Sequence, residues 1–239
     1  MSFSCEEKMN KKPFVSAVIV SAGSSSRMGG INKQFLKIDG IPVIAHSVKA
    51  FSNCDFIDEI VIVTRASDID EVNKIIRDYN LSKVVSVVMG GETRQLSVLS
   101  GVKEISSDAD FIAIHDGARP LVTEKVIIDT LNCAIESNAA TTGVKVVDTI
   151  KCVDEKENII DTPDRTFLRA VHTPQIFKKD LYIDAVNNVP NSKDFTDDCK
   201  LIEAYGHKVK IVNGDYKNIK ITTPSDIELA TYYLSKRGE

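Results

Sequence analysis

Four short runs of consecutive apolar residues alternate with amphipathic segments in the first half of the chain. The runs are VSAVIV (15–20), EIVIV (59–63), VVSVVM (84–89) and FIAI (111–114). Runs of this length are typical of strands that are buried on both faces of a parallel sheet. We therefore expect an α/β chain with a doubly wound, mostly parallel, Rossmann-like sheet.

The segments between these runs have helical periodicity. Apolar residues of 68–79 recur three or four positions apart, and Ser67 stands where an N-cap is expected. In 123–136 the apolar positions also share one helical face, directly behind Thr123. The sequence TPSD at 223–226 combines a capping residue, a proline and an acid, and it predicts the start of a final helix.

The alternation ends near residue 140, where β-branched runs without a helical period follow. A polar DEKEN turn separates two such runs, so we expect a projecting arm of two antiparallel strands over about 145–172. An isolated hairpin is marginally stable in water, and a partner subunit is the simplest surface for it to pack on. Beyond the arm, two more strands are expected over 208–213 and 218–222. Residues 1–12 are expected to form a disordered tail, and 13–239 a single domain.

The composition excludes several classes of protein. A net charge of −4 and a pI of about 5.7 argue against nucleic-acid binding, which usually needs a basic stripe. No apolar run approaches the roughly 18 residues of a membrane span. The five cysteines are scattered without a C-x-x-C pattern, which is typical of reduced thiols in a cytoplasmic protein.

A glycine- and serine-rich segment, SAGSSSRMGG at 21–30, follows the first apolar run. It matches neither the Walker A pattern nor G-x-G-x-x-G, which disfavours an NAD-dependent oxidoreductase on a similar sheet. Backbone N–H groups of such a loop can nevertheless bind phosphate oxygens. Arg27 and Lys33 would add a planar fork and a movable charge for the same anion.

Other polar residues also follow predicted strands, where the ligands of open α/β sheets bind. Residues 90–94 follow one strand, His115 to Pro120 follow another, and Lys220 lies in the predicted strand 218–222. Asp116 is available as a ligand for Mg²⁺, which prefers one or two carboxylates plus phosphates. No protease, lipase or zinc motif is present. This combination suits group transfer at a nucleoside triphosphate, where positioning and charge stabilisation are the main tasks.

Eight motifs then occur in order between about residues 15 and 236: AVIVSAGSSSRMG with NKQFL, GGETRQLSV, HDGARP, DTIK, TPDR, TPQ, TDD and NIKITTPSD. Together they resemble the 2-C-methyl-D-erythritol 4-phosphate cytidylyltransferase family. The resemblance implies a nucleotidyltransferase sheet and a Mg²⁺-dependent reaction. In it, CTP and methylerythritol phosphate give CDP-methylerythritol and pyrophosphate, within non-mevalonate isoprenoid biosynthesis. It also implies a homodimer in which the arm reaches the neighbouring subunit.

The resemblance also implies roles for individual residues. Those expected to be catalytic are Arg27, Lys33 and Lys220. Those expected to contact the nucleotide are Ala22, Gly23, Gly91, Ser97 and Asp116. Those expected at the sugar phosphate are Asp116, Arg119, Thr149, Arg165, Thr173 and Thr196, with Asp116 also at the metal.

Two alternatives stay open at this point. A ribitol 5-phosphate cytidylyltransferase would share the nucleotide half of the site, and a non-catalytic CTP-binding protein would have no need of Lys33, Lys220 and Asp116 together. The chain also departs from the family pattern in two places. Asn32 stands where many relatives have Pro, which puts the rigidity of the loop in question, and Gly117 stands where Ala is common.

Overall fold

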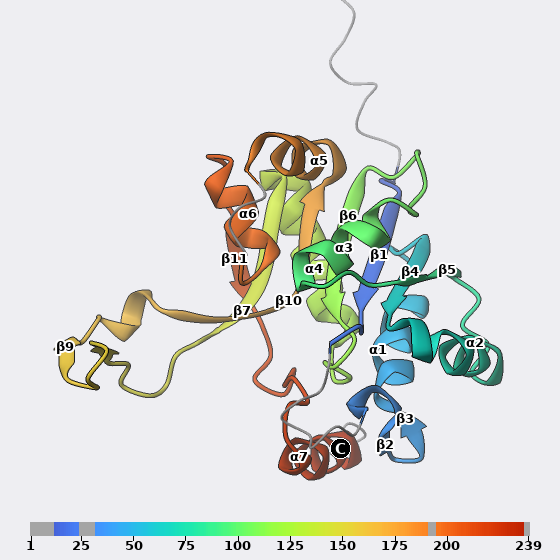
Figure 1. Ribbon diagram of the computed structural model, residues 1–239, viewed down its shortest axis with the longest axis horizontal. Coiled ribbons are helices and arrows are strands. Elements are labelled where there is room, and N and C mark those ends of the chain that lie inside the picture. The colour runs from blue at the N-terminus through green and yellow to red at the C-terminus, as the bar shows by residue number, and fades with distance from the viewer. Residues whose placement is uncertain (1–11, 24–31, 191–194, 237–239) are drawn as a thin grey trace, which may run out of the picture.

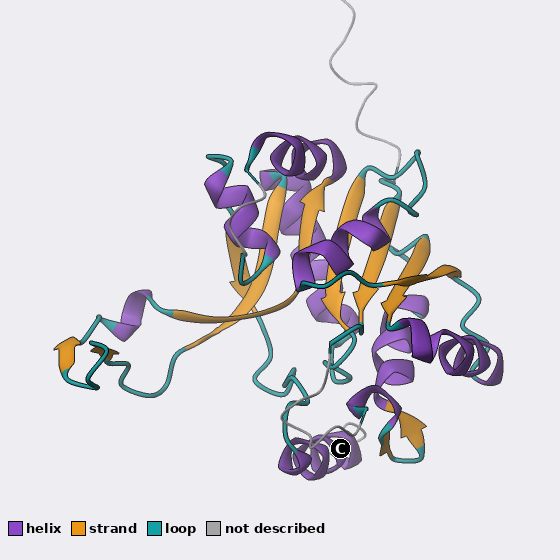
Figure 2. Cartoon of the chain, in the orientation of Figure 1, coloured by secondary structure: helices purple, strands orange, loops and turns teal. Residues whose placement is uncertain are grey.

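The protein is built around a seven-stranded sheet with helices on both faces, as Figures 1 and 2 show. The computed structural model describes residues 12–23, 32–190 and 195–236. In spatial order the strands are β11 (Lys210–Asn213), β7 (Ala139–Lys145), β10 (Arg169–Lys178), β6 (Phe111–Asp116), β1 (Val15–Val20), β4 (Glu59–Thr64) and β5 (Val84–Met89). The α-helices are α1 (Val43–Ser52), α2 (Ile69–Asp78), α3 (Arg94–Val102), α4 (Glu124–Ser137), α5 (Lys179–Asn188), α6 (Asp198–Ala204) and α7 (Pro224–Ser235). The shorter elements are β2 (Lys37–Ile38), β3 (Ile41–Pro42), β8 (Cys152–Val153), β9 (Ile159–Asp161), η2 (Lys33–Phe35), η3 (Ala66–Asp68) and η4 (Arg165–Phe167).

The sheet is parallel except for one strand. β6, β1, β4 and β5 pair in parallel, and so do β7 and β11. β10 runs antiparallel to both of its neighbours, β6 and β7. The expected doubly wound, mostly parallel α/β fold is therefore confirmed.

Two hydrophobic cores lie on opposite faces of the sheet, because successive side chains of a strand point to opposite sides. Ala17 and Ile19 of β1 belong to the core formed with α1, α2 and α4, whereas Val18 belongs to the core formed with α3, α5 and α6. A third, smaller cluster joins α7 to the segment around β2. These layers leave the carboxyl ends of the parallel strands uncovered by the helices that pack on the faces.

The prediction that 84–89 is buried on both faces is wrong. β5 is the edge strand and pairs only with β4, so its surface is only partly covered. Val85 is 57% exposed and Met89 is 59% exposed.

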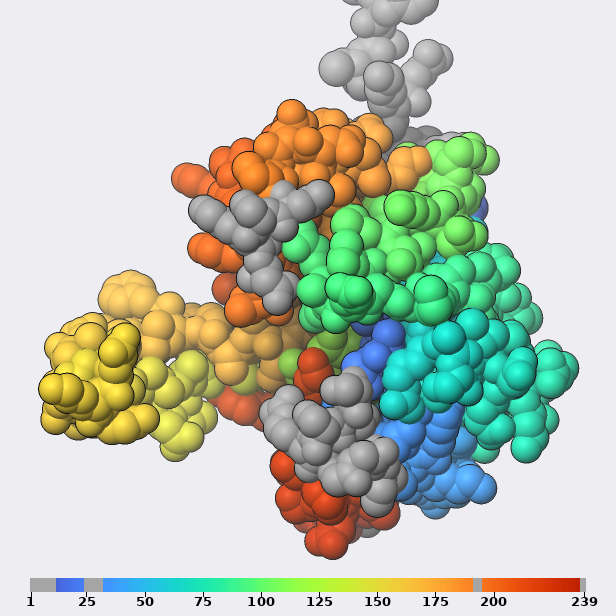
Figure 3. Space-filling model, in the orientation of Figure 1, coloured from blue at the N-terminus to red at the C-terminus, as the bar shows by residue number. Residues whose placement is uncertain are grey.

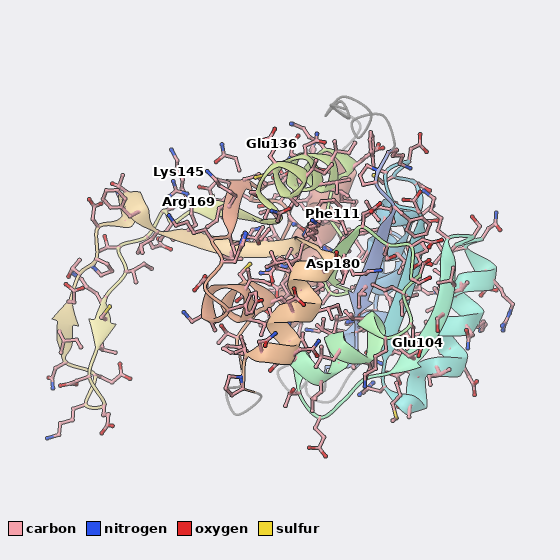
Figure 4. The ribbon with its side chains drawn as sticks, turned by 90° about the horizontal axis from the view of Figure 1, so that it is seen from above. Glu104, Phe111, Glu136, Lys145, Arg169 and Asp180 are labelled. Atoms are coloured by element: carbon pink, nitrogen blue, oxygen red, sulfur yellow. The ribbon has the colours of Figure 1, made fainter. Side chains whose placement is uncertain are left out.

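The arm leaves the body between β7 and β10, and Figure 3 shows its tip standing apart from the rest of the molecule. At its base Lys145 pairs with Arg169, both labelled in Figure 4. Farther out, β8 pairs antiparallel with β9 around the expected polar turn. The projecting part is 146–168, shorter than the expected 145–172, because residues 169–171 continue the pairing of β10 with β7 in the main sheet.

Two further expectations are wrong. Residues 218–222 form no strand, because Ile221 N–H donates to the carbonyl of Ala118 (2.8 Å) in the loop after β6 and not to a neighbouring strand. Ser67 is not the N-cap of α2: the cap position is Asp68, which ends η3, and the Ser67 hydroxyl donates to its carboxylate (3.0 Å).

The remaining expectations concern the two ends of the chain and its helices. The first eleven residues of the expected tail lie outside the described residues, and Lys12 pairs with Asp58 (3.2 Å). The capping sequence at 223–226 does begin α7, where the Asp226 carboxylate accepts from the Thr223 N–H (2.7 Å). Within the described ranges, no helix is long and apolar enough to cross a membrane.

Candidate functional site

A cavity of about 450 Å³ lies at the carboxyl ends of β1, β5 and β6. The segments after these strands bring small and charged residues together there, as expected for an open α/β sheet. Its lining consists of Val20, Ser21, Ala22, Gly23, Lys33, Gln34, Gly91, Glu92, Thr93, Arg94, Ser97, Asp116, Ala118, Lys220 and Thr222.

A second cavity of about 170 Å³ adjoins the first. Its lining consists of Arg94, Asp116, Arg119, Val171, His172, Thr173, Gln175, Thr196, Asp197 and Lys220. Arg94, Asp116 and Lys220 line both cavities. A group bound in one cavity therefore meets a group bound in the other at these three side chains.

Asp116 ends β6 and is surrounded by cations. Its Oδ2 lies 2.9 Å from Lys220 Nζ and 3.6 Å from Arg119 Nε, and its Oδ1 lies 3.6 Å from Arg94 Nε. Burial by itself would raise the pKa of this carboxyl, but the charges of Lys220, Arg94 and Arg119 outweigh burial. They hold the pKa of Asp116 well below its usual range. The junction of the cavities thus carries an ionised carboxylate with an excess of positive charge around it.

Arg94 is held by a second carboxylate on the side away from Asp116. Its Nη1 donates to Asp198 Oδ2 (2.6 Å), and the hydroxyl of the buried Tyr182 donates to Asp198 Oδ1 (2.8 Å). Burial would lower the pKa of Arg94, but Asp198 and Asp116 raise it above its ordinary value. The guanidinium stays charged and has a fixed orientation at the junction.

His115 is fully buried behind Asp116 and fixes the hydroxyl of Thr173. Its Nε2 lies 3.2 Å from the carbonyl oxygen of Arg119, which only accepts, so Nε2 carries the proton. Nδ1 then accepts from Thr173 Oγ1 (3.0 Å), and Thr173 Oγ1 accepts from the Asp116 N–H (3.1 Å). Burial lowers the pKa of His115 to about 4, which keeps the ring neutral. Since the hydroxyl proton of Thr173 points at His115, Thr173 can only accept a hydrogen bond from a group bound in the second cavity.

Close backbone approach explains the pair of glycines after β5. A Cβ added to Gly90 would lie 2.5 Å from Ala22 Cβ and 2.7 Å from Ser97 Oγ. One added to Gly91 would lie 2.4 Å from Leu96 Cβ. A side chain at position 90 would push the loop after β5 away from Ala22 in the loop after β1, and one at position 91 would push it away from α3. Either shift would change the wall of the larger cavity.

The described residues contain no group of three or more His, Cys, Asp and Glu side chains arranged to hold a metal ion. Asp116 is the carboxylate that lines both cavities, and cations pair with both of its oxygens. A Mg²⁺ ion usually needs one or two carboxylates plus substrate phosphates. This donor set therefore fits Mg²⁺ only when phosphate oxygens accompany it, and it does not form a site for a resident ion.

Comparison with known proteins identifies the relatives of this chain. The model of 2-C-methyl-D-erythritol 4-phosphate cytidylyltransferase matches residues 15–236. The chain belongs to this family. A relative of that name from Caldanaerobacter subterraneus subsp. tengcongensis is 45% identical over 225 residues, which are 93% of this chain and 99% of the relative. Another from Alkaliphilus oremlandii is 43% identical over 227 residues, 94% of this chain and 96% of the relative.

Solved structures agree with the family assignment. The crystal structure of 4-diphosphocytidyl-2C-methyl-D-erythritol synthase from Anaerococcus prevotii has a TM-score of 0.84 at 33% identity, covering 94% of this chain and 97% of that one. The cytidylyltransferase from Thermus thermophilus has a TM-score of 0.76 at 27% identity, covering 93% and 99%. The chain is thus a nucleotidyltransferase by family.

The structure brings most of the residues that the family resemblance predicted to one place. Those lining the larger cavity are Ala22, Gly23, Lys33, Gly91, Ser97, Asp116 and Lys220. Arg119, Thr173 and Thr196 line the smaller one together with Asp116 and Lys220. Thr149 and Arg165 line neither cavity, since both belong to the projecting part of the arm. Arg27 lies outside the described residues.

Several residues that line the cavities received no role from the sequence. Arg94 is the most important, because it lines both cavities and pairs with two carboxylates. Its position in GGETR, directly after a predicted strand, could have indicated that Arg94 belongs to the site. Gln34 and Gln175 lie in the motifs NKQFL and TPQ but received no role, and His172 carried no such signal, because its place in the smaller cavity depends on the packing of distant segments.

Proposed function

We propose that this chain transfers the cytidylyl group of CTP to 2-C-methyl-D-erythritol 4-phosphate, releasing pyrophosphate, in the non-mevalonate route to isoprenoids. The observation that carries the proposal is the pair of adjoining cavities that share Arg94, Asp116 and Lys220. The larger cavity has room for a nucleotide, and the smaller suits a compact polyol phosphate. Family membership supports the same pair of substrates.

In this reaction a phosphate oxygen of the polyol substrate attacks the α-phosphorus of CTP, and pyrophosphate leaves on the opposite side. The protein needs no nucleophile of its own, so catalysis depends on positioning and on stabilising charge. Lys33 lies in the wall of the larger cavity and Lys220 at the junction. We assign both to the charge that develops as pyrophosphate departs, and Arg27 is expected to join them.

Contacts to each substrate follow from the two linings. Ala22, Gly23, Gly91 and Ser97 would bind the cytidine part of CTP in the larger cavity. Arg119, Thr173 and Thr196 would bind the polyol phosphate in the smaller one. Asp116 would accept from substrate hydroxyls while it holds Lys220 and both arginines in place.

We propose that Mg²⁺ reaches the site together with CTP. When bound, the ion would neutralise charge on the triphosphate, with Asp116 as its protein ligand. The cations around Asp116 argue against binding of the ion alone, since a free Mg²⁺ would have to compete with Lys220 at 2.9 Å. Phosphate oxygens supply the ligands that the protein lacks.

We also propose a homodimer that forms through the arm. Phe167 is 84% exposed, Val147 67% and Ile160 66%, so several large apolar side chains of the projecting arm face solvent, as is common at protein interfaces. A two-stranded ribbon such as β8–β9 has too small a core of its own to be stable alone. A second copy of the chain would cover these side chains and would bring Thr149 and Arg165 to the neighbouring cavity. The cytoplasm is the expected location, since all four described cysteines are free thiols.

The test is pyrophosphate release from CTP and Mg²⁺, measured in parallel with methylerythritol 4-phosphate and ribitol 5-phosphate as acceptors. Turnover with the first alone supports the proposal. Turnover with ribitol 5-phosphate alone would leave the assigned roles of the residues in the larger cavity unchanged, but it would assign the protein to polyol-polymer synthesis. CTP binding without turnover on either acceptor overturns the proposed function.

A further inference from the structure

The short helix that carries Lys33 is fastened to a buried carboxylate outside both cavities. Asn32, which caps η2, donates from Nδ2 to Asp68 Oδ2 (2.8 Å). We propose that Asp68 is a positioning residue, which acts through Asn32 to hold Lys33 in the wall of the larger cavity. The catalytic consequence of this inference rests on the proposed function.

The side chain of Asn32 has a defined orientation because its two ends have different partners. Its Oδ1 accepts from the N–H of Gln34 (3.1 Å), the second residue of η2. Its Nδ2 donates to Asp68, whose ionised carboxylate only accepts. One amide therefore joins the first turn of η2 to Asp68 and cannot turn over without losing both hydrogen bonds.

Asp68 is itself held rigidly. Arg65 Nε donates to the same Oδ2 (2.7 Å), and Ser67 Oγ donates to Oδ1 (3.0 Å). The Asp68 side chain is only 9% exposed, and the segment directly follows β4, which pairs with a strand on each side. Charge-assisted hydrogen bonds of this kind are stronger than neutral ones. Asp68 therefore fixes the position of Asn32 relative to the sheet.

This fastening is needed because η2 is short. A 3₁₀ segment of three residues has poor internal hydrogen-bond geometry and little stability of its own. Lys33 and Gln34 line the larger cavity, whereas Asn32, Arg65 and Asp68 do not. Asp68 can therefore influence a reaction in that cavity only through the residues it holds.

The same contact restricts the backbone at position 32. Asn32 has φ −72°, within the range that a proline ring would impose. Two side-chain hydrogen bonds hold this conformation without a ring. The rigidity of the turn therefore depends on a partner 36 residues away.

The first experiment compares Asp68→Ala with Asp70→Ala. Both remove an acid near the start of α2, but Asp70 is exposed and makes none of these contacts. We expect Asp68→Ala to lower kcat about tenfold with little change in the KM of the polyol phosphate, since small misplacements of a reacting group are expensive. Asp70→Ala should stay within about twofold of the unchanged protein.

Two double variants distinguish positioning from a general loss of stability. Asn32→Ala combined with Asp68→Ala should be no slower than Asn32→Ala alone, because Asp68 acts through that side chain. Asn32→Asp alone places two carboxylates together and should lose activity. Adding Asp68→Asn restores a donor facing an acceptor while the new Asp still caps Gln34. Because Arg65 Nε then loses the oxygen to which it donates, kcat should recover in part and not completely.

A readout independent of turnover accompanies these assays. Hydrogen exchange of the Gln34 amide, followed by NMR in the full chain, should be about tenfold faster in Asp68→Ala and unchanged in Asp70→Ala. A wild-type protein without turnover overturns the proposed function, and the exchange rate still decides whether Asp68 holds the turn. The inference is overturned if hydrogen exchange of the Gln34 amide is unchanged in Asp68→Ala. It is also overturned if the losses of kcat add up in the double alanine variant, or if adding Asp68→Asn to Asn32→Asp restores no activity.

Discussion

Replacing Asp116 by Asn tests how strongly this carboxylate, shared by three cations, stabilises the junction of the cavities. The change keeps the shape of the side chain and removes its charge. Lys220, Arg94 and Arg119 would then lose the anion that lies 2.9 to 3.6 Å from each of them, and within the described residues only Arg94 would keep a second carboxylate partner, Asp198. We expect the free energy of unfolding to fall at pH 7.

The size of the effect follows from burial. At an effective dielectric constant of about 20, the attraction is about 6 kcal/mol at 2.9 Å and about 5 kcal/mol at 3.6 Å. Desolvation and repulsion among the cations offset most of this, and breaking a buried pair typically costs about 3–5 kcal/mol. The Lys220 side chain is 37% exposed and can turn towards water, so we expect the lower end, about 3 kcal/mol. In a chain of this length that lowers Tm by about 6–12 °C.

The effect should depend on pH in a defined direction. The pKa of Asp116 in the folded protein lies below its ordinary value of 3.8, so the unfolded chain takes up this proton first as the pH falls. The contribution of Asp116 is therefore complete above about pH 5 and declines below about pH 4. The stability gap between the unchanged protein and Asp116→Asn should stay constant from about pH 5 to 8 and narrow below that range.

Urea titration followed by circular dichroism measures these differences, with Asp129→Asn as the matched control. Asp129 pairs with Lys125 at 2.6 Å, a shorter distance, but both side chains are exposed, and such pairs contribute under about 1 kcal/mol. Equal losses for the two variants would show that burial does not decide the energy. An Asp116→Asn protein as stable as the original would refute the stabilising role of this carboxylate.

Three further predictions concern the proposed reaction. His115→Asn keeps an acceptor near the position of Nδ1 for the Thr173 hydroxyl, whereas His115→Leu has no acceptor, so the KM of the polyol phosphate should rise several-fold more in the Leu variant than in the Asn variant by steady-state kinetics. Arg165→Ala should impair the polyol phosphate and not CTP, and mixing it with Lys33→Ala, itself about 10²-fold slower in kcat, should restore activity through hybrid dimers. Calorimetric titration of Mg²⁺ should show tight binding only with CTP present, and tight binding without the nucleotide would contradict the charge argument at Asp116.

The sequence predicted the layers of the fold well because they depend on local patterns. Continuous apolar runs identified β1, β4 and β6, which are buried as expected. The same pattern misled for β5, since an apolar run does not reveal whether a strand lies at the centre or the edge of a sheet. The prediction of a strand over 218–222 failed for a similar reason. The segment has the residues of a strand, but its hydrogen-bonding partner is a loop and not another strand.

The candidate site was predictable to the extent that strand ends determine it. Lys33, Asp116 and the glycines after β5 follow parallel strands, so the sheet itself brings them to one edge. The orientation of Thr173 was not predictable, because it depends on a hydrogen bond to His115, 58 residues away. Contacts of this kind join segments whose sequences contain no sign of each other.

The order of the strands explains why the two sides of the site call for different experiments. β1 lies between β4 and β6, so the segment after β1 has a neighbour on each side. On the β4 side, Val63 accepts from Ser21 (2.7 Å) and Asp68 holds Asn32, and neither Val63 nor Asp68 lines either cavity. On the β6 side, Asp116 sets the charge at the junction of the cavities. Substitutions near β4 should therefore alter the rate through geometry, and those at the end of β6 should alter stability and pH dependence through charge.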